Sequence, residues 1–351
     1  MSQAPPPPSM RPNPGQLVDF FARSLTAFQS SRDPLRVLCT LPHSSASATS
    51  TSAASSPSVV DAEPAPRRAS GPVRRLIVLD SSFNPPTRAH AQMVRSAVRD
   101  AKGGEARASG ATRVMLLLAV NNADKAPKPA SFPVRLCMME GFARELLGGE
   151  AGREASTVLG ARGAHASEDG AGLKADLAVT TMPYFHDKAR AINASRFYGG
   201  ANDAPEQVFL AGYDTLIRIF NPKYYGGGEA AGTAAADRHN KEETAMQAAL
   251  DPFFATARLR VSTRPDDEWG GLEEQREYVR GLENGRLDAV GGRGEWARRV
   301  DVVSMDRGDG MEGVSSSRAR EAVKERNDQE LERMVDGEVR AWIEKEKLYL
   351  E

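Results

Sequence analysis

Six short apolar segments constrain the fold of this chain more than any other feature, and helix-like segments lie between most of them. The apolar runs are 75–79, 113–120, 176–182, 207–212, 257–262 and 300–305. Segments that are apolar at nearly every position are typical of strands buried on both faces, as in a parallel sheet covered by helices. The alternation therefore predicts an α/β fold: a doubly wound, Rossmann-like parallel sheet of about six strands, with helices on both faces.

Helical spacing is visible in the segments between these strands and at the end of the chain. Val134, Met138, Phe142 and Leu146 recur at the spacing of one helix face. The tail 338–351 is amphipathic and is also predicted to be helical.

The first 72 residues divide into three parts. Residues 1–14 are rich in proline and are expected to be disordered. Residues 15–42 contain a predicted helix followed by a short strand, and they are expected to pack on the main domain. Residues 43–72 are rich in serine, alanine and proline, with too few large apolar groups to offset the entropy of ordering, so a flexible linker is predicted. The main domain is then expected over 73–351.

Composition excludes several classes of protein. The net charge is −1, which gives no bulk electrostatic attraction to nucleic acid or to anionic membranes. There are two cysteines, Cys39 and Cys137, so a disulfide framework and a cysteine-rich zinc site are not expected, and a reducing compartment is. No run of about 18 apolar residues is present, so no membrane span is predicted.

The turn after the first predicted strand of the main domain is the first candidate site. It runs from Asp80 to Thr87 and is followed by His90 in the first helical turn. Free N–H groups at a helix start bind anions, and Thr87 and His90, three residues apart, share one helix face. A hydroxyl and an imidazole at this place favour a phosphate site. The alternative is a turn made rigid by its two prolines, with Thr87 as the helix N-cap.

A second motif follows the last predicted strand. In the segment 313–323, one of three serines at 315–317 is expected to cap a helix that carries Arg318 and Arg320. Hydroxyls, free N–H groups and arginines at a helix start suit a triphosphate. Taken alone, this motif would instead indicate a capped surface helix with solvated arginines.

Together, SFNPPTRAH at 82–90 and SSSRAR at 315–320 resemble the signature of the nucleotidylyltransferase superfamily. The sequence of the first motif is most similar to that of the nicotinamide mononucleotide adenylyltransferase family, in particular its fungal-type branch. The resemblance covers about residues 73–351 and extends, in the same order, through the segment bearing Lys125 and Arg135, GYDTL at 212–216, STR at 262–264 and WIEKEKLY at 342–349.

The resemblance implies an enzyme that joins ATP and nicotinamide mononucleotide to give NAD and pyrophosphate. It implies that His90 and Arg320 are catalytic. The residues it assigns to ATP are Ser82, Phe83, Thr87, His90, Ser316, Ser317 and Arg320. Those it assigns to the mononucleotide are Lys125, Gly212, Asp214, Tyr224, Tyr225 and Arg264.

The resemblance further implies Mg²⁺ as a cofactor that accompanies ATP, without a metal site of the protein's own. ATP and nicotinamide mononucleotide are the expected partners, nucleic acid and membrane are not, and a homo-oligomer is compatible with the sequence. The expected location is the cytoplasm, the nucleus or both.

This chain departs from the family pattern at several positions, among them Ala89 where a glycine is usual and Ser317 where threonine is commoner. Ser81 stands where a glycine usually precedes Ser-Phe, and the tryptophans that often stack on nicotinamide are missing, so that Tyr224 or Tyr225 would have to replace them. Two alternatives therefore stay open. One is adenylyl or cytidylyl transfer to another phosphate acceptor, such as pantetheine phosphate. The other is an ATP-binding regulatory protein or ATPase of the same fold.

Overall fold

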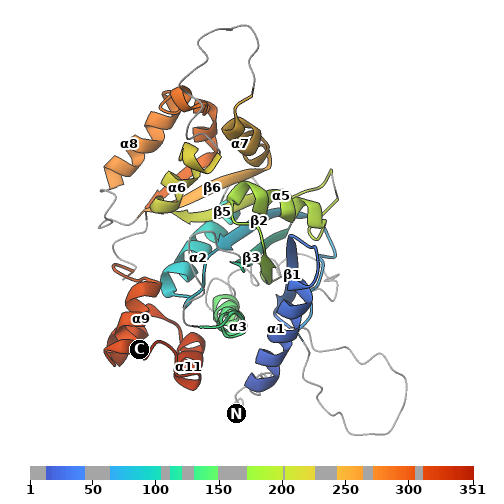
Figure 1. The fold of residues 1–351 in the computed structure, drawn as a ribbon, viewed down its shortest axis with the longest axis vertical. Helices are drawn as coiled ribbons and strands as arrows, with labels where there is room; N and C mark the ends of the chain where they lie inside the picture. Colours follow the sequence, from blue (N-terminus) through green and yellow to red (C-terminus); the bar gives the residue numbers. More distant parts are fainter. Residues whose placement is uncertain are drawn as a thin grey trace, which may run out of the picture.

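The computed structural model of this chain describes residues 13–43, 64–103, 111–120, 130–148, 172–200, 202–225, 243–263, 272–304 and 311–351. They build a sheet of seven strands in the order β1-β4-β3-β2-β5-β6-β7 (Figure 1). The strands are β1 (Leu35–Leu41), β2 (Val73–Asp80), β3 (Ala111–Ala119), β4 (Lys174–Thr180), β5 (Glu206–Gly212), β6 (Ala257–Thr263) and β7 (Val300–Ser304). All six strands predicted for the main domain are present and mutually parallel, which confirms the predicted fold class.

The order of the parallel strands is that of a Rossmann fold. From the central strand β2 the chain moves outward to β3 and β4, and it then crosses back to β5 on the other side of β2. The direction of winding reverses between β2 and β5. In open α/β sheets, ligands bind beyond the carboxyl ends of the strands at such a switch point. The turn after β2 therefore lies where a ligand is expected.

Helices cover both faces of the sheet (Figure 1). Each face has its own buried apolar cluster. On one face lie α1 (Pro14–Gln29), α2 (Arg88–Gly103), α3 (Phe132–Gly148), α9 (Ser316–Lys324), α10 (Asp328–Met334) and α11 (Gly337–Lys345). On the other lie α5 (Phe185–Ser195), α6 (Tyr213–Ile219), α7 (Ala245–Thr256), α8 (Leu272–Glu283) and three short 3-10 helices, η1 (Pro222–Tyr225), η2 (Asp288–Val290) and η3 (Gly294–Arg299).

The central strand shows why its sequence is apolar at consecutive positions. Ile77 and Leu79 belong to the cluster on the α3 side, whereas Leu76 and Val78 belong to the cluster on the α7 side. Because successive side chains of a strand point to opposite faces, a strand covered on both sides needs apolar residues throughout.

The N-terminal helix and strand belong to the same sheet assembly. Leu17, Phe21, Leu25 and Phe28 of α1 are buried, and α1 packs against α3. Strand β1 pairs with β4 in the antiparallel direction and extends the sheet at its edge. No helix in the described part of the chain is long and apolar enough to cross a membrane.

The linker predicted over 43–72 extends too far at its C-terminal end. The N–H of Thr40 donates to the carbonyl of Ala65 at 3.0 Å, and the N–H of Arg67 donates to Oγ1 of Thr40 at 2.9 Å. Residues after 64 therefore supply hydrogen-bond partners to edge strand β1. Without them, backbone groups on the outer side of this strand would have no partner within the protein. The rest of the predicted linker, 44–63, and the proline-rich residues 1–12 lie outside the described residues.

Candidate active site

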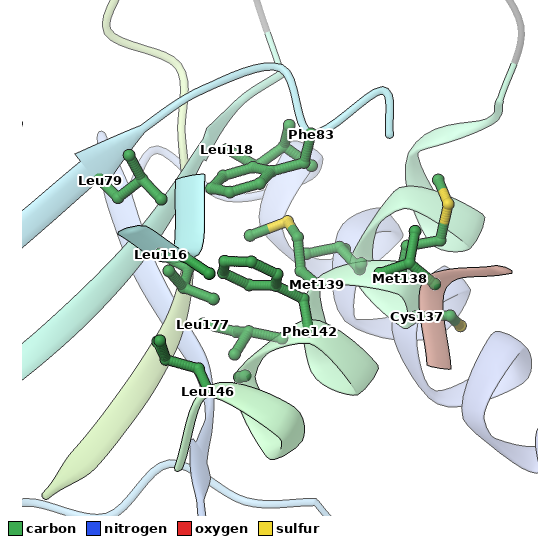
Figure 2. Packing of buried hydrophobic residues seen from close by; sticks show 14 of the residues in the cluster. Leu79, Phe83, Leu116, Leu118, Cys137, Met138, Met139, Phe142, Leu146 and Leu177 are labelled. Carbon is green, nitrogen blue, oxygen red and sulfur yellow. The ribbon is translucent and has the colours of Figure 1, made fainter. Parts of the chain in front are cut away.

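The turn between β2 and α2 is anchored by one buried side chain. Phe83 is fully buried, and Figure 2 shows its ring near Leu118 and Met139 in the cluster on the α3 side. Its φ is +46°, in the left-handed region that non-glycine residues seldom occupy. The core contacts of the ring hold the backbone in this conformation. Phe83, one of the predicted site residues, therefore anchors the turn through its buried ring, and only its backbone is available to a ligand.

His90 is held on both ring nitrogens by residues of the same turn. Nδ1 lies 3.0 Å from the backbone nitrogen of Thr87 and 2.8 Å from Oγ1 of Thr87. Nε2 lies 3.1 Å from Oγ of Ser81. A backbone N–H can only donate, so Nδ1 accepts, and in the neutral ring the proton resides on Nε2. Ser81, the departure from the family's glycine, contributes directly to holding this ring.

Thr87 fits both interpretations of the turn. Its carbonyl accepts the N–H of Ala91 at 3.2 Å, as expected at the start of α2. Its hydroxyl nevertheless lies against Nδ1 of His90, so the start of the helix and the imidazole form one unit.

The second predicted motif lies against the first. The hydroxyl of Ser316 donates to the carbonyl of Pro85 at 2.8 Å, and Nη1 of Arg320 donates to the carbonyl of Asn84 at 2.7 Å. Nη2 of Arg320 also donates to Oγ of Ser317 at 3.2 Å. The two hydrogen-bonded residues Ser316 and Pro85 are 231 positions apart in the chain.

Two helix N-termini therefore converge on one turn. Helix α2 starts directly after it, and α9 starts at Ser316, with Ser315 as an N-cap that accepts the N–H of Arg318 at 3.2 Å. Free N–H groups and the helix dipole give each N-terminus a partial positive charge. Together with the guanidinium of Arg320, they make the turn suited to a polyphosphate.

Arg135 of α3 adds a second guanidinium, on the inner side of the turn. Its Nη1 donates to the carbonyl of Ser82 at 3.4 Å and its Nε to the carbonyl of Ala130 at 2.8 Å. Burial lowers the pKa of Arg135, and the nearby positive charge of Arg320 acts in the same direction. The Ser82 side chain is exposed, and its carbonyl is held inward.

A buried ion pair next to the turn was missed by sequence reasoning. Nζ of Lys188 contacts Oδ2 of Asp80, the last residue of β2, and the two side chains are only 5% and 8% exposed. Nζ also lies 5.4 Å from the centre of the Phe185 ring. Lys188 comes from α5, so the pair ties the start of that helix to the switch point. The aspartate at the strand end was a visible signal, but its partner lies 108 residues away.

An aromatic group lies next to this ion pair along α5. The rings of Tyr184 and His186 are nearly parallel at 5.6 Å between centres, Tyr184 is 6.2 Å from Tyr224, and His186 is 5.7 Å from Tyr225. The hydroxyl of Tyr225 donates to the carbonyl of Ile219 at 2.6 Å. Tyr184 is 37% exposed. Of the two predicted tyrosines, Tyr225 supports the group from within, and Tyr184, which was not predicted, offers the exposed ring.

Gly212 and Asp214 lie at the end of β5, on the other side of the switch point. Gly212 is the N-cap of α6, and a Cβ at this position would lie 2.8 Å from Oδ1 of Asp214. Glycine therefore allows the carboxylate to fold back over the start of the helix. The two other residues predicted for the mononucleotide, Lys125 and Arg264, lie outside the described residues.

The donor set near the turn bears on the expected Mg²⁺. Within the described ranges, no group of three or more histidine, cysteine, aspartate or glutamate side chains could hold a metal ion. Mg²⁺ in nucleotide sites is often held chiefly by substrate phosphates and water. The expectation that Mg²⁺ is bound together with ATP stays a prediction.

Comparisons with known proteins support the interpretation of the motifs. The chain is 29% identical over 260 residues, 74% of its length and 80% of the other protein, to the Schizosaccharomyces pombe protein named "Putative nicotinamide mononucleotide adenylyltransferase". No family model matches the chain. This similarity to a fungal protein confirms the resemblance to the nicotinamide mononucleotide adenylyltransferase family, and the named relative is a nucleotidyltransferase, the class that the motifs imply.

The solved structures that match this chain are more distant in sequence. Plasmodium falciparum nicotinic acid mononucleotide adenylyltransferase, complexed with NaAD, matches 79% of this chain and 97% of its own with 12% identity and a TM-score of 0.41. The same enzyme complexed with APC matches with 11% identity and a TM-score of 0.39, over the same shares of the two chains.

Proposed function

We propose that this chain is an adenylyltransferase that joins nicotinamide mononucleotide to the adenylyl group of ATP and releases pyrophosphate. The observation that carries this proposal is the junction of the two phosphate motifs, where Arg320 and Ser316 bind the backbone of the turn that holds His90. The junction lies at the switch point of the parallel sheet, which supports the proposal of a nucleotide site there.

In the proposed reaction, a 5′-phosphate oxygen of the mononucleotide attacks the α-phosphorus of ATP in line. The bond from the α-phosphorus to the bridging oxygen of the β-phosphate breaks, and its electron pair leaves with pyrophosphate. The nucleophile is already an anion, so no general base is needed. Mg²⁺, held by the phosphates, would offset the charge of the leaving pyrophosphate.

The protein then has two tasks, alignment and charge stabilisation. Well-oriented reactants can reach effective molarities of about 10⁵–10⁸ M, so alignment alone supplies much of the rate. Nδ1 of His90 is held as an acceptor by Thr87, so Nε2 carries the proton; this N–H would exchange its contact with Oγ of Ser81 for the α-phosphate and stabilise the charge that develops there. Ser317 and Arg320 at the start of α9 would hold the β- and γ-phosphates.

The acceptor is proposed to bind on the α5 side of the switch point. The exposed ring of Tyr184, supported by His186 and Tyr224, offers an aromatic face to the pyridine base. Asp214, whose carboxylate lies close to Gly212, would accept hydrogen bonds from ribose hydroxyls. Lys125 and Arg264 are retained as proposed partners of the mononucleotide phosphate.

Calorimetric titration tests the acceptor directly. Nicotinamide mononucleotide, its acid analogue and pantetheine phosphate would each be titrated into the protein saturated with a non-hydrolysable ATP analogue and Mg²⁺. We expect saturable binding of one or both pyridine mononucleotides and none of pantetheine phosphate. Binding of ATP analogue alone, with no pyridine mononucleotide bound, would support the regulatory or ATPase alternative instead.

A further inference from the structure

The chain turns sharply after α11, where the sequence predicts that the helix continues. The N–H of Leu348 donates to the carbonyl of Ile343 at 3.0 Å, and the N–H of Lys347 donates to that of Glu344 at 3.3 Å. These are the two hydrogen bonds of a Schellman motif, with Lys347 at φ +48° in the position that usually holds glycine. The prediction of a helix through the end of the tail is therefore wrong beyond Lys345.

This turn directs Tyr349 back into the molecule. Tyr349 is 5% exposed, and its own φ of +61° is again left-handed. A left-handed backbone conformation is unfavourable for a non-glycine residue, so two of them within three residues persist only where their surroundings fix them. The contacts of Tyr349 supply that restraint.

The hydroxyl of Tyr349 reaches the turn between β2 and α2 (81–87), which we call the phosphate turn. It donates to Oδ1 of Asn84 at 2.7 Å across 265 residues of chain. Burial raises the pKa of Tyr349, so the hydroxyl keeps its proton at neutral pH and acts as a donor. The backbone carbonyl of Asn84 accepts Nη1 of Arg320, so both oxygens of this buried asparagine are occupied.

Three backbone carbonyl groups of the turn accept hydrogen bonds from side-chain donors. Arg135 binds the carbonyl of Ser82, Arg320 that of Asn84 and Ser316 that of Pro85. A carbonyl oxygen facing a phosphate would repel it, whereas N–H groups facing it form an anion site. Side-chain donors that keep the carbonyls away from the ligand therefore help to prepare the turn for phosphate.

We propose that Tyr349 is a positioning residue of the phosphate turn, which fixes Asn84 so that the turn and His90 meet the triphosphate of ATP in a productive geometry. This inference rests on the proposed function, because it assigns the turn to ATP. Tyr349 itself touches the turn and not the reacting atoms.

The test is Tyr349→Phe in the full-length chain, which removes one hydroxyl and leaves the ring. The matched control is Tyr198→Phe. Tyr198 is also buried, and its hydroxyl donates to Oδ2 of Asp176 at 2.9 Å in the first half of β4, away from the carboxyl ends of the strands. Both variants lose one buried phenol hydrogen bond, so both are expected to lower the melting temperature.

Only the first variant should change the handling of ATP. We expect Tyr349→Phe to lower kcat/KM for ATP about five- to tenfold, with KM for the mononucleotide within about twofold of wild type. Tyr198→Phe should leave both constants within about twofold. Equal kcat/KM for ATP in wild type and Tyr349→Phe, or an equal loss in both variants, would overturn the inference.

A double-mutant cycle with Asn84→Ala separates a coupled pair from two independent effects. If Tyr349 acts through Asn84, adding Tyr349→Phe to Asn84→Ala should cost little more than Asn84→Ala alone. Fully additive losses would contradict the inference.

Failure of the proposed function would be recognised separately. If the wild-type protein forms no dinucleotide, calorimetry can still measure the affinity of the wild-type protein and of Tyr349→Phe for the ATP analogue. A five- to tenfold weaker affinity in the variant would support the positioning role, and an unchanged affinity would refute it.

Discussion

The Nζ atom of Lys188 contacts Oδ2 of Asp80 at the carboxyl end of the central strand β2, and both side chains are buried there. Removing one partner of a buried ion pair leaves an uncompensated charge, which costs about 3–5 kcal/mol. Lys188→Met should therefore lower the free energy of unfolding by about that amount. The double variant Asp80→Asn with Lys188→Met should be more stable than Lys188→Met alone. Urea denaturation of the three proteins measures this, and equal stability of the single and double variants would contradict it.

The guanidinium of Arg320 uses two nitrogens at the phosphate turn, so a side chain with a single nitrogen should not replace it. Its guanidinium binds the carbonyl of Asn84 through Nη1 and Ser317 through Nη2, which a lysine cannot reproduce. We expect Arg320→Lys to lower kcat/KM for ATP about 10- to 100-fold. The control is Arg333→Lys in α10, where Arg333 is exposed and pairs with Glu330. An equal effect of both variants in steady-state kinetics would count against the assignment of Arg320.

Substitution of Tyr184 should change the KM for the mononucleotide and not the KM for ATP. Stacking of a base on an aromatic ring contributes about 1–3 kcal/mol, so Tyr184→Ala should raise KM for the mononucleotide by about 5- to 100-fold. Tyr184→Phe retains the ring and is the matched control, with KM expected close to wild type. If alanine and phenylalanine behave alike, or if KM for ATP rises instead, the base does not stack on this ring.

His186 predicts a pH dependence of stability. Burial lowers its pKa below the ordinary 6.5, the carboxylate of Asp187 opposes this shift, and Arg190 adds to it. Below about pH 6.5 the unfolded chain therefore binds a proton that the folded protein resists, so stability falls as pH decreases in this window. His186→Phe keeps an aromatic ring between Tyr184 and Tyr225 and cannot titrate. Between pH 7.5 and pH 5.5 the melting temperature should fall less for this variant than for wild type. An identical fall in the two proteins would exclude the effect.

Local patterns were sufficient to predict the parallel sheet and to single out the two motifs at 82–90 and 315–320. Strand β2 had to be apolar at consecutive positions because Ile77 and Val78 face different clusters, and that requirement is visible in the sequence. The convergence of Thr87 with His90 follows from helical spacing and is present in the structure. The antiparallel addition of β1 could not be predicted, because it depends on pairing with β4 about 140 residues later.

Long-range pairs account for most of what sequence reasoning missed. Lys188 has no local signal as the partner of Asp80, and Tyr349 was assigned to a helix because its neighbours have helical periodicity. The contact that fixes Tyr349 is with Asn84, 265 residues away. Ser81 was judged by the glycine it replaces, whereas its value lies in the hydroxyl that meets His90.

Adenylyl transfer is proposed to take place at the turn that holds His90. The most direct measurement mixes the purified protein with ATP, Mg²⁺ and nicotinamide mononucleotide and follows the dinucleotide and pyrophosphate together. We predict equal amounts of both products, and a loss of about 10²–10³ in turnover for His90→Ala that folds with an unchanged circular dichroism spectrum. ADP and phosphate without dinucleotide, or a His90→Ala variant with near wild-type turnover, would contradict this account.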